Sequence, residues 1–103
     1  MLDTVLLMLN EYKKAEQKHP GFPRDRFRQL AILQEEVGEV TKAILEYEIT
    51  FESADTHNIT PVNRIEMKKA IENELAQVAA MALRMMQHPE GQDEKAGLAK
   101  TSS

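Results

Sequence analysis

The sequence has 103 residues and no cysteine, which is enough for one domain and excludes disulfides, thiolate zinc sites and cysteine nucleophiles. Its formal net charge of -4 argues against a broad surface for a nucleic-acid polymer or an anionic membrane. Apolar residues make up 42% of the chain, which is normal for a globular protein.

The first predicted element is a helix over residues 2–18. Apolar residues recur there at helical spacing, and the following sequence HPGFP at 19–23 cannot continue a helix. No basic segment precedes its apolar stretch, so we do not interpret it as a signal peptide. No apolar run reaches the roughly 20 residues of a membrane span. We therefore expect a cytoplasmic protein that does not enter a membrane.

The second predicted helix begins at Arg24 or Asp25 and ends at about Phe51. Its weak position is Gly38, because a glycine within a helix costs about 1 kcal/mol relative to alanine. That glycine indicates either a close approach of a neighbouring element or simple tolerance of a weak residue. The polar stretch over 52–60 predicts a loop.

A third helix is predicted from Pro61 to about Gln87. Thr60 offers a hydroxyl N-cap, and proline suits the first helical position. Pro89 and Gly91 are expected to end the helix.

Together these elements predict an all-α fold, an antiparallel helical bundle completed by homo-oligomerisation. Residues 1–88 are expected to form a single domain, and the small and polar residues 89–103 a disordered tail. A monomer of this length builds only a thin core, so a second copy would cover the apolar surface that a helical hairpin leaves open. We expect a homodimer or homotetramer.

The second helix carries an acid inside its apolar stripe. At about 100° per residue, Glu36 falls within that stripe and Glu39 lies on its margin. The stripe itself consists of Leu30, Leu33, Val37, Val40, Ile44 and Tyr47.

The third helix repeats the pattern. Glu74 lies inside its apolar stripe, and Gln77 lies on the margin three residues later, a spacing that puts both on one face. The stripe consists of Met67, Ile71, Leu75, Val78, Ala82 and Met85.

If the two stripes pack together, Glu36, Glu39, Glu74 and Gln77 converge. Buried carboxylates require compensation, and Mg²⁺ or Mn²⁺ prefers oxygen ligands of this kind. We therefore predict a divalent-metal site formed by these four side chains. The alternative is that each acid pairs with a lysine or arginine of another helix.

The string EEVGEV at 35–40 resembles the EExxE signature of the MazG-like all-α nucleoside triphosphate pyrophosphohydrolases, including small phage- and integron-associated members. The string ELAQ at 74–77, within ENELAQVAAMALR, stands where that family has ExxD. The resemblance covers about residues 20–87. It implies a helical bundle that dimerises or forms dimers of dimers. It also implies Mg²⁺-dependent hydrolysis of a nucleoside triphosphate to a monophosphate and pyrophosphate.

The resemblance further implies roles for individual residues. Glu36, Glu39 and Glu74 would be metal ligands, with the Gln77 amide oxygen as a neutral fourth. Glu35, or one of the ligand carboxylates Glu36 and Glu39, would orient or deprotonate the attacking water.

Cationic and aromatic side chains complete the expected nucleotide site. Lys42, Lys68, Lys69 and Arg84 are candidates to hold phosphates, and each has the alternative of being ordinary surface charge. Phe22 would either stack on the base or serve as a hydrophobic plug.

Two other functions remain open because Gln77 replaces the expected aspartate and the loop between the two motifs is longer than usual in the family. One is a non-catalytic relative that binds metal or nucleotide. The other is a helical oligomerisation protein whose acids are merely paired.

Overall fold

The computed structural model describes residues 1–52 and 61–91, with residues 51, 52, 61 and 62 described by their backbone alone. These ranges contain no β-strand and three helices, α1 (Leu2–Lys18), α2 (Arg26–Glu52) and α3 (Pro61–Gln87). The predicted all-α class is confirmed. The predicted loop with its N-cap Thr60, and the tail from residue 92 onward, lie outside the described residues. None of the three helices is both long enough and apolar enough to cross a bilayer.

Local sequence signals explain where the helices begin and end. The Asp25 carboxylate accepts a hydrogen bond from the Phe27 amide at 2.9 Å, as an N-cap does at the start of α2. Pro61 begins α3, where its missing N–H would have had no helical partner. Gly91 follows α3 with a φ of 82°, a left-handed conformation that glycine adopts without strain. The predicted helix bounds are confirmed, with α2 starting one or two residues later than expected.

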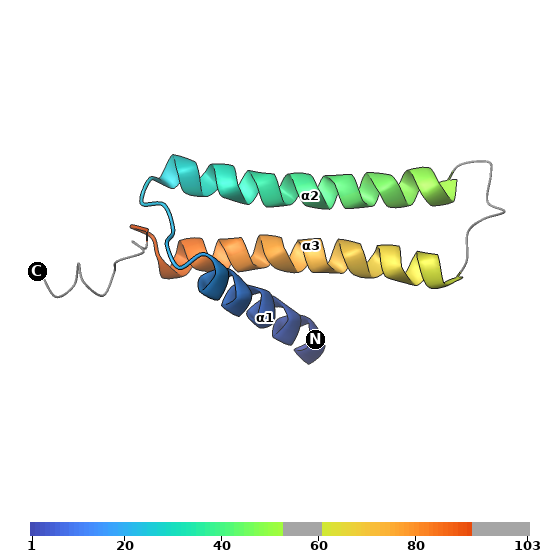
Figure 1. Cartoon of the computed structure of the whole chain (residues 1–103), viewed down its shortest axis with the longest axis horizontal. Coiled ribbons are helices and arrows are strands. Elements are labelled where there is room, and N and C mark those ends of the chain that lie inside the picture. Colours follow the sequence, from blue (N-terminus) through green and yellow to red (C-terminus); the bar gives the residue numbers. More distant parts are fainter. Residues whose placement is uncertain (53–60, 92–103) are drawn as a thin grey trace, which may run out of the picture.

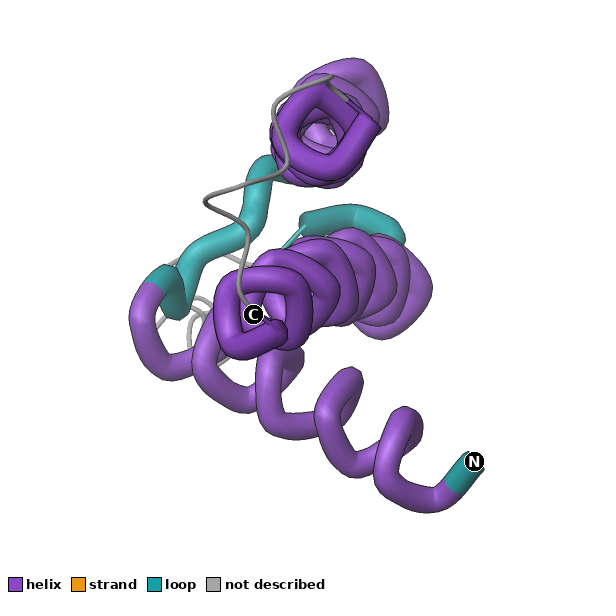
Figure 2. The backbone as a smooth tube through the Cα atoms, turned by 90° about the vertical axis from the view of Figure 1, so that its right-hand side faces the viewer, coloured by secondary structure: helices purple, strands orange, loops and turns teal. Residues whose placement is uncertain are grey.

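Helix α3 is the central element. Helices α2 and α3 lie side by side and run in opposite directions, and α1 crosses the other side of α3 (Figure 1). The view along the hairpin places α3 between its two neighbours (Figure 2). Among the described residues, α1 packs on α3 and not on α2. Helices α1 and α2 therefore lie on different sides of α3.

The loop over 19–25 is fastened to the end of α3 by Gln29, whose side chain is fully buried. Its Nε2 donates hydrogen bonds to the Pro23 carbonyl at 2.7 Å and to the His88 carbonyl at 3.2 Å. The Arg26 guanidinium donates to the Gln29 Oε1 at 2.9 Å and to the Met85 carbonyl at 3.3 Å. The Met85 carbonyl lies in the last turn of α3, where helical carbonyls lack N–H partners within the helix, and the Arg26 guanidinium supplies one.

Arg84 fastens the same loop from α3. Its Nη2 donates to the His19 carbonyl at 2.6 Å and to the Gly21 carbonyl at 3.2 Å, and its side chain is almost fully buried. The guanidinium carbon stands 4.7 Å from the centre of the Phe22 ring. Phe22 in turn belongs to the small buried core with Ala80 and Met81. A charged side chain is tolerated here because carbonyls and an aromatic face surround it.

The faces that pack overlap only partly with the predicted apolar stripes. On α2, the stripe residues Leu30, Val37 and Ile44 are 43%, 46% and 40% exposed, while Val40 of the stripe is buried together with Gln29, which lies outside it. The packed face of α2 is therefore rotated toward Glu36. On α3, the most buried positions include Ala76 and Ala80, while the stripe residue Leu75 is 50% exposed. The physical reason is that α3 must accommodate helices on two sides, and alanines permit the closer approach.

Gly38 has open space around it. A Cβ atom built on Gly38 would meet nothing within 4 Å in the part of the chain that the structure describes. Of the two interpretations of this glycine, the single chain therefore gives no support to a close approach.

Candidate functional site

Glu36 is the centre of the candidate site. It lies on the packed face of α2 and is partly buried. Burial raises the pKa of Glu36 above its ordinary value, and the neighbouring carboxylates of Glu74, Glu39 and Glu35 raise it further, in that order. Glu74 of α3 is thus close enough to Glu36 of α2 for the two carboxylates to repel each other.

Glu74 has an oxygen that lacks a partner. Its Oε2 is buried and receives no hydrogen bond from the residues that the structure describes. A buried acceptor left in this state is unfavourable by roughly 1–3 kcal/mol, and more if it is charged. A cation or a donor placed against Glu74 would relieve both this loss and the repulsion from Glu36. The donor set therefore fits a hard divalent ion.

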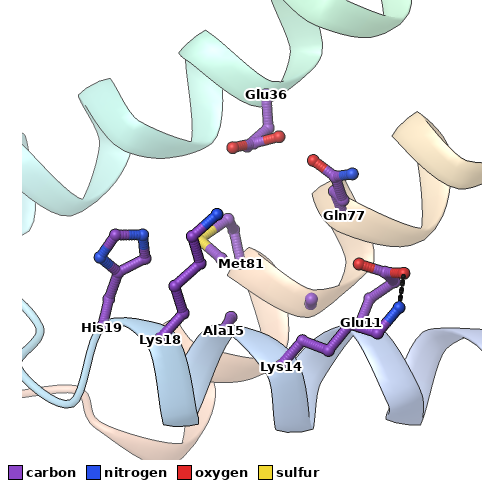
Figure 3. A pocket seen from close by; sticks show the side chains of 9 residues that line it. Glu11, Lys14, Ala15, Lys18, His19, Glu36, Gln77 and Met81 are labelled. Carbon is purple, nitrogen blue, oxygen red and sulfur yellow. Dashed lines mark hydrogen bonds and ion pairs between the residues drawn. The ribbon is translucent and has the colours of Figure 1, made fainter.

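The four predicted ligands are divided between two depressions. Glu36 and Gln77 extend toward each other from α2 and α3 and line a cleft of about 270 Å³ beside α1 (Figure 3). We call it the α1 cleft, and its lining residues are Glu11, Lys14, Ala15, Lys18, His19, Glu36, Gln77, Ala80 and Met81. Glu39 and Glu74 line a smaller depression of about 180 Å³, the acidic pocket, together with Lys42, Ala43, Glu46 and Ala70.

The four side chains do not form a closed cage in this single chain. Among residues 1–52 and 61–91, no three acidic or histidine side chains stand together as a preformed metal site. Mg²⁺ commonly binds one or two carboxylates together with water and substrate phosphates, rather than a complete set of protein ligands. The geometry therefore offers a partial ligand set, with Glu36 and Glu74 at its centre.

The predicted phosphate and base contacts have different positions. Lys42 lines the acidic pocket, and Lys69 is exposed on α3 outside the described pockets. Arg84 is engaged with the 19–25 loop, so its guanidinium is not directed into either depression. Phe22 is 4% exposed, so of its two interpretations the hydrophobic plug is confirmed. Glu35 is exposed and acts on the site through its charge.

Helix α1 contributes side chains that the sequence interpretation missed. Lys14, Lys18 and His19 line the α1 cleft from the side opposite Glu36 (Figure 3). Glu11, Lys14 and Lys18 are spaced three and four residues apart, so a helical wheel places them on one face. The signal was present in the sequence. This spacing alone did not indicate a role in the site, because it does not show that α1 faces α2.

Glu16 fixes that position. Its Oε1 lies 2.9 Å from the His88 Nε2 and 3.6 Å from the Arg84 Nε, so one carboxylate of α1 joins two side chains at the end of α3. The Tyr12 side chain also bonds to Glu16, and burial together with this carboxylate raises the pKa of Tyr12. Because Arg84 is buried, Glu16 provides the negative charge that it needs.

No family model, curated protein or solved structure matches this chain. The case for a function therefore depends on the geometry of the site and on the motif resemblance.

Proposed function

We propose that the protein is a Mg²⁺-dependent nucleotide pyrophosphohydrolase that converts a nucleoside triphosphate into a monophosphate and pyrophosphate. The observation that carries the proposal is the electrostatic coupling of Glu36 and Glu74, which belong to the two paired helices α2 and α3. One of these acids has a raised pKa and the other has a buried oxygen without a partner. The EEVGEV and ELAQ strings supply the reaction class.

Each side chain of the proposed site has its own role. Glu36 and Glu74 hold the cation, with Glu39 and the Gln77 amide oxygen as neighbouring ligands. When bound, the cation supplies charge neutralisation for the phosphates and activation of water. Exposed Glu35 is free to orient or deprotonate that water, because it is near the site without being buried in it.

Pyrophosphate release from a panel of canonical and modified nucleoside triphosphates, with Mg²⁺ or Mn²⁺, tests the proposal. Turnover is expected for the wild type. Glu36→Gln and Glu74→Gln should lose more activity than the roughly 10–100-fold that loss of a second-shell partner of a metal ligand costs. Exposed Glu90→Gln serves as the control. Folded wild-type protein that releases no pyrophosphate from any nucleotide would contradict it.

A second candidate function is favoured by Gln77, which gives the α1 cleft an amide where the resemblance leads us to expect a carboxylate. The protein would then bind metal or nucleotide without hydrolysing it. In that case calorimetry detects nucleotide binding, the wild type shows no turnover, and Gln77→Asp gains activity. Efficient hydrolysis by the wild type would exclude this alternative.

We also propose that the bundle is completed by a second copy of the chain, as a homodimer or homotetramer. The exposed stripe residues Leu30, Val37 and Ile44 support this proposal, because they form an apolar row that the single chain leaves uncovered.

A further inference from the structure

Basic side chains of α1 and of the residue that follows it face Glu36 of the hairpin across the α1 cleft. Lys18 and His19 extend from the end of α1 toward Glu36, and Lys14 lies one turn earlier (Figure 3). Within the described residues, neither Lys18 nor His19 forms an ion pair with Glu36. The lysines Lys14 and Lys18 therefore lie across the cleft from the Glu36 carboxylate, and the one acid on the α1 side, Glu11, is paired with Lys14.

Lys14 is held only loosely in its present position. Its Nζ lies 3.4 Å from the Glu11 carboxylate, and 72% of its side chain is exposed. Exposed ion pairs of this kind contribute about 0–1 kcal/mol, so a stronger anion in the cleft would attract Lys14 away from Glu11.

The charges around the C-terminal end of α1 favour a bound anion. A helix C-terminus carries partial negative charge, which would repel a phosphate. Here Arg84 donates to the His19 and Gly21 carbonyls just beyond the helix, and Lys18 adds a positive charge in the last turn. Both features offset the negative end of the helix dipole beside the α1 cleft, which Lys18 and His19 line.

We propose that Lys14, Lys18 and His19 form a phosphate-binding subsite, so that the α1 cleft takes a polyphosphate chain as its divalent-cation complex, with Glu36 on the cation side. The identification of this chain as that of a nucleotide rests on the proposed function. The volume of about 270 Å³ lies below the roughly 300–1,000 Å³ of sites that enclose a whole drug-sized ligand. No phenylalanine, tyrosine or tryptophan is among the described residues that line the cleft. The cleft thus suits the phosphates, and the base lies outside it.

The subsite differs from the phosphate contacts expected from the sequence. All three residues precede Pro20, where the motif resemblance begins, and none of them is Lys42, Lys69 or Arg84. We therefore assign phosphate binding to the end of α1 and not to the hairpin.

Isothermal titration calorimetry of the full chain with inorganic pyrophosphate and Mg²⁺ tests the proposal. Lys18→Gln is expected to raise the Kd for pyrophosphate by about tenfold or more, the loss typical of a charge-assisted hydrogen bond. The double variant Lys14→Gln/Lys18→Gln should raise the Kd further. Lys13→Gln is the matched control, since Lys13 is an exposed α1 lysine outside the cleft, and its Kd should stay within about twofold of wild type. Circular dichroism confirms that each variant is folded.

A second titration uses a nucleoside triphosphate with an α,β-imido bridge, which cannot be cleaved at that position. If the same lysine substitutions weaken binding of this analogue as much as they weaken binding of pyrophosphate, the subsite holds the phosphates of a nucleotide. If the substitutions weaken only the binding of pyrophosphate, the subsite binds free pyrophosphate and its assignment to a nucleotide is overturned.

The outcomes separate the subsite from the catalytic proposal. If nucleotides are turned over but pyrophosphate binds the lysine variants as tightly as wild type, the subsite is excluded and the proposed function stands. If no nucleotide is turned over while pyrophosphate binding still depends on Lys18, the catalytic proposal fails and the subsite stands. Wild-type protein that binds neither probe overturns the subsite.

Discussion

At the scale of single residues, Glu36 determines how the site responds to pH. Its pKa in the folded protein is raised above the ordinary value of 4.5, so folding disfavours its charged form. The stability contributed by Glu36 is therefore fully present below about pH 4.5 and is lost as the pH rises through the raised folded pKa. Desolvation by the hairpin and repulsion from Glu74 cause this loss.

Glu36→Gln removes the titrating group and keeps the shape of the side chain. The Tm of the metal-free variant should exceed that of wild type by about 1–3 °C at pH 7, a small shift because the side chain is largely solvated, and the difference should vanish near pH 4. Differential scanning calorimetry measures both. Addition of Mg²⁺ should raise the Tm of wild type and leave that of the variant unchanged. A wild-type Tm that does not change when Mg²⁺ is added would instead favour a purely structural role for the acids.

Substitution by alanine should change the free energy of unfolding in opposite directions at Gly38 and at Gly91. A Cβ at Gly91 would lie 2.4 Å from the Arg24 Cα, and the backbone there has a positive φ, so Gly91→Ala should lower the free energy of unfolding by about 2 kcal/mol. Gly38→Ala meets open space and should raise it by about 1 kcal/mol. Urea unfolding measures both. A destabilised Gly38→Ala would show that another chain packs against that position.

At the scale of elements, Arg84 is the link between α3 and the 19–25 loop. Arg84→Met removes the donors to the His19 and Gly21 carbonyls and leaves Glu16 without its buried partner. The free energy of unfolding should fall by about 3 kcal/mol, as when one member of a buried pair is removed. Arg28→Met, at an exposed position of α2, should change it by less than about 0.5 kcal/mol. Equal urea midpoints for the two variants would contradict the role of Arg84.

The extent of successful prediction also differs between elements. The limits of α1 and α3 were predictable because Pro20, Pro23, Pro61 and Gly91 act locally on the backbone. The packed faces were not, because periodicity shows that a helix has an apolar side but not which neighbour covers it. Alanines, which a hydrophobic stripe undervalues, turned out to be the packing surface of α3.

The candidate site shows the same division. The unusual position of Glu36 in an apolar arc was evident from one helix alone, and the structure gives it the raised pKa that such a position implies. The roles of Arg84 and of the α1 lysines depend on the crossing of α1 over α3, a relation between distant segments that no local spacing encodes.

At the scale of the whole molecule, the uncovered row of α2 predicts self-association. Size-exclusion chromatography with light scattering should give a dimer or tetramer for the wild type. Val37→Lys, in the middle of the exposed row, should shift the protein to monomer, because burying an unpaired ammonium is strongly unfavourable. Ala31→Lys is the control, since Ala31 is exposed on another side of α2. A wild type that is monomeric at micromolar concentration would contradict the assembly.

The position of α1 has a consequence for motion. No residue of α1 is buried, and among the described residues the helix packs on α3 alone, so it can detach while α2 and α3 stay paired. Amide hydrogens of α1 should therefore exchange with deuterium faster than those of central α3. A ligand in the α1 cleft would touch α1 and α2 at once, and its binding free energy would add to the docking of α1. Slower exchange confined to α1 would thus report occupancy of the cleft before any reaction is identified.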